Sequence, residues 1–444
     1  MCAPGCFSLY RASALKQVMD KYASPTWTPF TVYVKDTGED RWMATLMMIH
    51  GWRLRFTAFA DNTTYCPDTF EEFFKQRRRW ILSDIANALL VVQNLYSLVK
   101  NNDCFTFVYV AYLLNMFVNN VITPGTAIVM ITAGMELVFD VPYAYTTLPM
   151  ALIVYAYAIA CTRTSTQTQT ILTSVMTIFM GSIFFSVAVW GSYKIVAAMV
   201  YESVGGHFRF QQHYVILMLT LSLVYAALAH PRECHEIVYG FAYLFIFPAM
   251  HVLLPIYSIA NIIDQSWGTR DSNKAKIRKL ICLPSFKKFR RKKKNKGTEN
   301  DDENDVIKDA VASQIDEMVN GTAEEQSEND FWLHMRSTLI GNDVNTGLEK
   351  AALADGLRQM RNRSLTGLLI INALWLCLLS YFYMGVSSSL SRLNVYGVIS
   401  GALYGFTLTI QVFGLTVCRI NYLLRKLARC LYSDERTMWV CEKK

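Results

Sequence analysis

Two short motifs in this chain combine residue types that can do chemistry. The first is Gly38-Glu39-Asp40-Arg41, in which two neighbouring carboxylates precede a cation. A carboxylate can act as a general base, and charged neighbours tune its pKa. The second motif, QRRRW, ends at Trp80. Its arginines can hold a diphosphate through charge-assisted hydrogen bonds, while the tryptophan offers a flat apolar ring to a sugar.

Each motif also has a plainer interpretation. An acidic turn such as GEDR is common on solvated surfaces. Arginines beside apolar segments often meet anionic headgroups and set the orientation of a membrane protein. Taken alone, neither motif decides between a catalytic role and a surface role.

The element that carries QRRRW is predicted to be a helix. Asp68 or Thr69 can cap it, and each has a glutamate three residues later, which is a capping-box pattern. At 100° per residue the three arginines fan over about 200° and cannot all face one partner. Gln76, Arg79 and Trp80 share one face, whereas the other two arginines point elsewhere.

An apolar stripe continues along the same predicted helix and is suited to lying in the headgroup plane. Its residues are Ile81, Ile85, Leu89, Val92 and Tyr96. We therefore predict one amphipathic interfacial helix over residues 69–100. It would join a polar site to the membrane surface.

The composition predicts a polytopic membrane protein. Of 444 residues, 52% are hydrophobic and 13% aromatic, which is too apolar for one soluble domain of this length. Apolar runs long enough to cross a bilayer are predicted at 105–135, 144–161, 170–195, 213–229, 236–260, 366–386 and 395–417. Eleven cysteines without a CxxC pair indicate reduced packing residues rather than a disulfide framework or a zinc site.

The first 68 residues look soluble. Two β-like runs, FTVYVKD and LRFTAFAD, flank a segment that is predicted to be helical, EDRWMATLMMIHGW. A transporter or channel is disfavoured, because the apolar runs carry few ionisable residues. Those present, Glu136, Asp140 and Lys194, all lie near the ends of predicted spans.

Read together, the motifs resemble the chitin synthase family. CAPGCFSLYRASAL, GEDRWMATLMM and QRRRW follow one another in this order, TYCPDTFEEFF precedes the arginines, and SWGTRD follows the fifth predicted span. Hyaluronan and cellulose synthases share the Gln-x-x-Arg-Trp element, but the PGCFSLYR stretch is similar to chitin synthases in particular, of the animal and protist type. The ordered set is far more specific than any one motif.

The resemblance implies a processive family 2 glycosyltransferase that transfers N-acetylglucosamine from UDP-N-acetylglucosamine to a growing β-1,4 chain with inversion. Asp40 matches the general base of the family. Gln76, Arg79 and Trp80 match the acceptor and diphosphate site. Glu39 and Arg41, which flank Asp40, and Arg77 and Arg78 are further candidates for substrate binding. Pro4, Gly5 and Cys6 match the acceptor channel, and Ser266, Trp267, Gly268, Thr269 and Arg270 are candidates for a channel gate.

The fold expected from this resemblance is mostly α, with a polytopic helical bundle preceded by a partial α+β segment of the GT-A type. Its parts are residues 1–68 of a cytosolic glycosyltransferase domain, the interfacial helix 69–100, the membrane bundle 101–263, a polar loop 264–365, a transmembrane hairpin 366–417 and a basic tail 418–444. The expected location is the plasma membrane. Expected partners are the UDP-sugar, the chitin chain, lipid and a second copy of the chain, but no nucleic acid.

The family's aspartate-rich donor-binding half is not recognisable here. We therefore expect a C-terminal portion that does not catalyse transfer alone, and we expect the ligands of the family's divalent metal, Mg²⁺ or Mn²⁺, outside this chain. A non-catalytic membrane partner derived from a degenerate synthase is the alternative. No set of metal ligands is assigned to these residues.

The side of the membrane for residues 264–365 is the remaining conflict. Five spans after a cytosolic segment would place them outside, but the run from Lys274 to Lys296 is rich in lysine and arginine and gives a strong inside signal. We predict the cytosolic side. Pro248 and Pro255 would then make the fifth apolar run broken or re-entrant.

Overall fold

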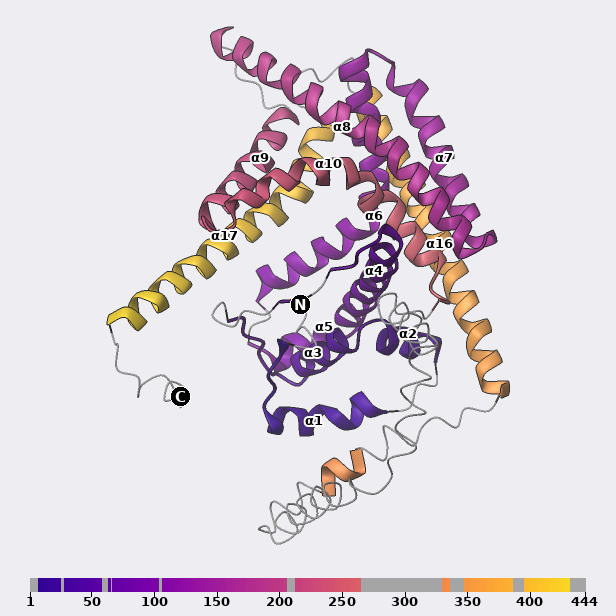
Figure 1. Cartoon of the computed structure of the whole chain (residues 1–444), viewed down its shortest axis with the longest axis vertical. Coiled ribbons are helices and arrows are strands. Elements are labelled where there is room, and N and C mark those ends of the chain that lie inside the picture. Colours follow the sequence, from indigo (N-terminus) through magenta and orange to yellow (C-terminus); the bar gives the residue numbers. More distant parts are fainter. Residues whose placement is uncertain are drawn as a thin grey trace, which may run out of the picture. The chain divides into compact units, whose positions relative to one another are not determined.

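The computed structural model describes residues 7–24, 28–57, 63–64, 66–103, 106–205, 212–264, 330–335, 347–385 and 395–431. These residues form helices and contain no β-strand (Figure 1). The chain divides into two compact units. The first comprises Met1–Leu54, Thr64–Asn102 and Ile262–Met360; the second comprises Arg55–Thr63, Asp103–Asn261 and Arg361–Lys444. The mostly α prediction is confirmed, whereas an α+β glycosyltransferase segment is not seen among the described residues.

The first unit is built on short helices. They are α1 (Ala12–Ala23), α2 (Pro29–Thr37), α3 (Glu39–Ile49), α4 (Phe70–Gln93) and α5 (Leu95–Asn101). The helix predicted around EDRWMATLMM is confirmed as α3.

The β-like prediction for FTVYVKD is wrong, because this run forms α2. Thr28 caps the helix by accepting a hydrogen bond from the backbone N–H of Thr31 at 3.2 Å, and Pro29 occupies the first turn. A cap and a proline at this position start a helix strongly enough to override the β-propensity of Val32 and Val34. The described part of the second β-like run, residues 54–57, is not a strand either.

The helix predicted over residues 69–100 is two helices. Thr69 caps α4 by accepting a hydrogen bond from the N–H of Glu72 at 3.2 Å, as the capping pattern predicted. The chain then bends by 70° between α4 and α5. At the bend the Asn94 side chain donates to the Leu90 carbonyl at 2.8 Å, and such local bonding competes with continuation of the helix.

The bend brings α5 back to α3. The Asn101 side chain donates to the Ile49 carbonyl at 3.0 Å, and Asn102 donates to the Trp52 carbonyl at 3.2 Å. The last carbonyls of a helix have no partner within it, so these amides satisfy groups at and just beyond the end of α3. The predicted apolar stripe therefore runs straight only as far as Val92.

The second unit holds the long apolar helices. They are α6 (Phe107–Phe139), α7 (Tyr143–Arg163), α8 (Thr166–Gly205), α9 (Gln212–Ala229), η2 (Cys234–Tyr239), α10 (Gly240–Pro248), η3 (Ala249–Leu253), α11 (Leu254–Ala260) and α17 (Val395–Leu431). Helix α16 (Gly347–Gly385) begins in the first unit and ends in the second.

Six helical stretches in the described part of the chain are long and apolar enough to cross a membrane. They are Phe107–Phe139, Tyr143–Arg163, Thr166–Lys194, Cys234–Ala260, Ala351–Met384 and Gly401–Ala428. The membrane-protein prediction is thus confirmed. The predicted span 213–229 forms α9, which is not among the six.

The predicted interruption of the fifth apolar run is present. Pro248 ends α10, and the π-helix η3 follows directly before α11. Proline lacks an N–H and its ring crowds the preceding turn, which a π-turn can absorb. Cys234–Ala260 is nevertheless one of the six stretches that are long and apolar enough to cross a membrane. That this run is re-entrant stays a prediction.

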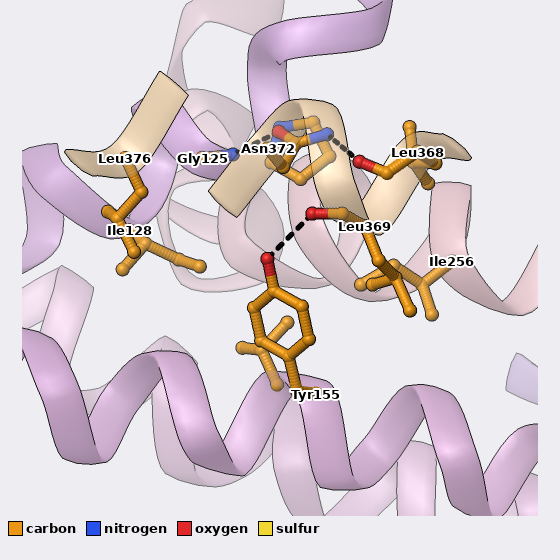
Figure 2. A pocket seen from close by; sticks show the side chains of 10 residues that line it. Gly125, Ile128, Tyr155, Ile256, Leu368, Leu369, Asn372 and Leu376 are labelled. Atoms are coloured by element: carbon orange, nitrogen blue, oxygen red, sulfur yellow. Dashed lines mark hydrogen bonds between the residues drawn. The ribbon is translucent and has the colours of Figure 1, made fainter. Parts of the chain in front are cut away.

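Helix α6 is completed by a side chain from α16. Pro124 lies inside α6, and the next residue, Gly125, donates its N–H to Asn372 Oδ1 at 2.7 Å. Asn372 Nδ2 donates in turn to the Val121 carbonyl at 2.9 Å. The Asn372 amide thus supplies a partner to the Gly125 N–H and to the Val121 carbonyl, which would pair with each other in an α-helix without a proline. Figure 2 shows this contact at the edge of an apolar pocket, where the Tyr155 hydroxyl also donates to the Leu369 carbonyl at 2.8 Å.

Candidate active site

Asp40 lies in the first turn of α3, directly after Glu39 and the N-cap residue Gly38. The helix dipole favours carboxylates in this position. Asp40 Oδ1 accepts a hydrogen bond from the backbone N–H of Arg41 at 2.8 Å. The candidate base is therefore held by the start of a helix rather than by a free loop.

Helix α4 presses against the residue that precedes these carboxylates. A β-carbon on Gly38 would overlap Ser83 Oγ and would lie only 2.7 Å from Ser83 Cβ and 3.7 Å from Asp40 Oδ1. The α-carbon of Gly38, the Ser83 side chain and the Asp40 carboxylate thus meet at one place. Only glycine leaves room for this contact.

Two further contacts join α3 to α4. Arg41 forms an ion pair with Asp84, and Thr45 Oγ1 donates to Asn87 Oδ1 at 3.2 Å. Arg41 was predicted to tune Asp40, but its side chain is directed to Asp84. Together with the Gly38 contact, these pairs advance along both helices in the same direction, so α3 and α4 run side by side with the same polarity.

This geometry bears on the predicted face of QRRRW. In helical geometry Gln76, Arg79 and Ser83 follow one another at intervals of three and four residues and share a side of α4. Ser83 contacts Gly38, so the side that carries Gln76 and Arg79 continues from the contact with α3 toward the start of α4. That these side chains converge with Asp40 on one cavity stays a prediction.

The three arginines have three different surroundings. The Arg77 guanidinium lies 5.1 Å from the ring centre of Phe73 and 4.5 Å from that of Trp80, in cation–π contact with both. Arg78 is 1% exposed and forms an ion pair with Asp264. Arg79 is half-buried. The sequence indicated that they point apart, but not which partners they find.

Trp80 is 40% exposed, although it belongs to a helix with a buried side. Arg77 covers its ring and restrains it. A restrained, partly exposed indole is suited to stacking on a sugar ring, because little side-chain entropy is lost on contact.

Tyr22 of α1 is a neighbour of the carboxylates that the motifs did not reveal. Burial raises its pKa above the usual value, and the negative charges of Glu39 and Asp40 raise it further. The Tyr22 hydroxyl therefore lies near enough to both carboxylates to be affected by their charge. No sequence motif marks Tyr22, because it lies on another helix. In the sequence, Gly38 is visible only as a small residue before the acidic pair. Ser83 is visible only as a small residue on the same helix face as Gln76.

Several predicted site residues lie outside the described residues. They are Pro4, Gly5 and Cys6 near the start of the chain, and Ser266, Trp267, Gly268, Thr269 and Arg270, which follow Asp264, the last described residue after α11. Among the residues that are described, no group of three or more His, Cys, Asp or Glu side chains could hold a metal ion. The donor set present does not fit a divalent metal site.

Comparisons with known proteins support the resemblance on which the site was predicted. Residues 1–196 match the family model described as chitin synthase. The chain is 34% identical over 275 residues to a chitin synthase of Meloidogyne artiellia. It is 32% identical over 273 residues to chitin synthase chs-2 and 31% identical over 274 residues to chitin synthase chs-1, both of Caenorhabditis elegans.

Each of these three alignments covers 61% of this chain. The chain spans only 14% of the Meloidogyne protein, and 16% and 20% of the two Caenorhabditis proteins. The predicted resemblance is confirmed for this portion. The region matched by the family model contains α1 to α7 and most of α8, and so includes both GEDR and QRRRW.

Proposed function

We propose that this chain forms the acceptor-side and membrane part of a chitin synthase, which transfers N-acetylglucosamine from UDP-N-acetylglucosamine to the 4-hydroxyl of a growing β-1,4 chain. The observation that carries the proposal is the docking of the Asp40 turn on α4, the helix of QRRRW, through the Gly38–Ser83 contact. Similarity to chitin synthases over the same residues supports it.

In this mechanism Asp40 takes the proton of the acceptor hydroxyl as its oxygen attacks the anomeric carbon. The bond from that carbon to the UDP oxygen breaks, and UDP leaves with the bonding electron pair. Attack opposite the leaving group inverts the anomeric carbon in one step. One carboxylate suffices as base, unlike the carboxyl pair of glycosidases.

The QRRRW side chains complete the site in this proposal. Arg79 stabilises the charge that develops on the leaving diphosphate, because a fixed cation helps most where charge appears in the transition state. Trp80, restrained by Arg77, stacks on an acceptor sugar, and Gln76 hydrogen-bonds to it. The divalent metal implied by the resemblance would neutralise the diphosphate; the described residues do not supply its ligands, and no step here passes through it.

We place the first unit on the cytosolic side of the plasma membrane, where UDP-sugars are available. The residues after the span Cys234–Ala260 return to this unit, because Asp264 pairs with Arg78 of α4. Before the next span, Gly356 of α16 lies against the ring of Pro29 in α2. Contacts at both ends of the segment 264–365 support the cytosolic side for it.

The test is Asp40→Asn in the full-length protein, expressed in membranes of a host that makes no chitin. Removing a general base should lower incorporation of labelled N-acetylglucosamine by about 10²-fold to 10⁴-fold and leave binding of UDP-N-acetylglucosamine nearly unchanged. The chitinase-sensitive product measures the first, and protection of a photoreactive UDP-sugar label measures the second.

Asp20→Asn is the matched control, since it removes an exposed carboxylate from α1 of the same unit. Wild-type polymer yield from Asp40→Asn would remove Asp40 from the catalytic role. A wild-type protein that makes no polymer, but associates with an active synthase, would instead favour the non-catalytic membrane partner.

A further inference from the structure

Arg78 is the most deeply buried charged side chain of the motif. It is 1% exposed, and its guanidinium pairs with the carboxylate of Asp264, 186 residues further along the chain. Both residues belong to the first unit. The Arg78 side chain is 2% exposed and that of Asp264 is 29% exposed, so the pair gives a buried guanidinium an opposite charge. Loss of Asp264 therefore raises the cost of burying Arg78 on α4.

Asp264 follows the span Cys234–Ala260 after a short turn. At the start of this turn Asn261 caps α11, and its side chain donates to the Tyr257 carbonyl at 2.9 Å and to Gln169 Oε1 at 2.8 Å. The four-residue stretch from Asn261 to Asp264 is therefore held at each end by side-chain polar contacts, one in each unit. The chain that continues from Asp264 starts from a defined place on α4.

We propose that Arg78 is a positioning residue rather than a substrate ligand: by pairing with Asp264 it fixes the start of the segment after the span next to the turn of α4 that carries Arg79 and Trp80. This proposal rests on the proposed function. Arg78 itself contacts neither sugar nor diphosphate. Its loss should therefore act on turnover and polymer length, and not on the affinity for UDP-N-acetylglucosamine.

Charge reversal tests the pair. Arg78→Glu and Asp264→Arg should each lower kcat at least tenfold and shorten the product, with KM for UDP-N-acetylglucosamine changed less than twofold. The double variant, Arg78→Glu with Asp264→Arg, restores opposite charges in exchanged positions and should recover most of kcat and product length. Asp264→Asn is the milder variant if Arg78→Glu does not accumulate in the membrane, and it should show the same split between kcat and KM.

The Lys75–Glu71 pair of the same helix is the matched control. Its atoms are 2.7 Å apart, but the pair is solvent-accessible, so its reversal should change kcat and product length less than twofold. A KM that rises at least tenfold in Arg78→Glu and stays raised in the double variant would show that Arg78 binds substrate. That outcome would overturn the proposal.

A second measurement does not depend on catalysis. In a protein with Arg78→Cys and Asp264→Cys, a bifunctional thiol reagent that spans about 8–10 Å should join the two positions, because the α-carbons of an arginine and an aspartate in an ion pair lie beyond the reach of a disulfide. The cross-link is detected by mass spectrometry after proteolysis, and Leu89→Cys with Asp264→Cys, about three turns further along α4, should not give it. If wild-type membranes make no polymer but the cross-link forms, the proposed function fails and the pairing stands. If wild-type is active and the cross-link does not form, the positioning role fails alone.

Discussion

At the residue scale, the place of Asp40 depends on a neighbour that has no side chain. The φ angle of Gly38 is −168°, which is extended backbone that any residue adopts. What excludes other residues is space, because Ser83 of α4 occupies the position of a β-carbon. A side chain at residue 38 would lift the Asp40 turn from α4, and a misplacement of about 1 Å can cost about 10²-fold in rate.

Gly38→Ala should therefore lower polymer synthesis about 10²-fold and destabilise the protein by about 1–3 kcal/mol, as overpacking does. Ser83→Ala in the same chain should rescue little, since Ser83 Cβ remains 2.7 Å from the new methyl carbon. Ser83→Gly should rescue most of the activity, although glycine itself costs about 1 kcal/mol inside a helix. Labelled-sugar incorporation and thermal unfolding in detergent measure the two effects.

Gly367→Ala is the control for this series, because nothing lies within 4 Å of a β-carbon at that position of α16. It should leave both activity and stability unchanged or slightly improved. Normal activity in Gly38→Ala would show that the contact with Ser83 does not position Asp40.

At the element scale, the helices of the second unit are joined by polar side chains that complete one another's backbones. Asn372 is 7% exposed and bridges the interrupted turn of α6 after Pro124, while Trp375 Nε1 donates to Thr126 Oγ1 at 2.8 Å. In a lipid environment an unsatisfied backbone group is expensive, and a proline inside a span is tolerated where a neighbouring helix supplies the missing partners.

Asn372→Leu keeps the approximate size of the side chain but removes both partners of the α6 backbone. Each buried polar group left without a partner costs about 1–3 kcal/mol, so we expect a loss of about 2–4 kcal/mol in unfolding free energy. Thermal unfolding of the detergent-solubilised protein measures it. Asn362→Ala, at an exposed position of the same helix, should change little; equal stability of the two variants would contradict a bridging role for Asn372.

The sequence predicts those features of the helices that depend on residues only a few positions apart. The Thr69 cap and the helical EDRWMATLMM segment follow from patterns within a few residues, and both were predicted. The cap formed by Thr28 and Pro29 is equally local, but the β-branched residues after it favour a strand, and only the structure shows that the cap prevails. The partners of Arg78 and Asn372 lie 186 and about 250 residues away in the chain, and no local pattern names them.

The candidate site divides in the same way. Asp40, Gln76, Arg79 and Trp80 were found through ordered motifs, and helical spacing placed three of them on one face. Tyr22 lies near the carboxylates because α1 packs on α3. Arg41 was predicted to tune the pKa of Asp40, but it pairs with Asp84 instead. Packing between helices decides both, and one sequence does not reveal it.

At the scale of the whole molecule, the side of the membrane occupied by residues 264–365 can be measured. The ion pair of Asp264 with Arg78 and the packing of Gly356 on Pro29 join both ends of this segment to the first unit. The basic run within it favours the same side. We therefore predict that the segment lies on the cytosolic side, which we propose for residues 1–102.

Two glycosylation sequons, at Asn320 and Asn362, report on this placement. In a host with a secretory pathway both asparagines should stay unmodified, because glycans are added only on the luminal side. Gel mobility with and without an endoglycosidase measures it, beside a co-expressed glycoprotein that confirms the host's activity. A mass shift that disappears in Asn320→Gln would place the segment outside.

The hydrogen bonds between Asn372 and the backbone of α6 also affect how the protein assembles during its synthesis. Gly125 leaves the ribosome 247 residues before Asn372, which at about 5–20 residues per second is roughly ten to fifty seconds. Throughout that interval α6 is present without the amide that completes its backbone. Its unpaired groups must be sheltered by water, by the insertion machinery or by another helix until α16 arrives. The helices of the second unit must therefore assemble in a fixed order, because α6, the first to be synthesised, obtains its missing hydrogen-bond partners only when α16 has been made.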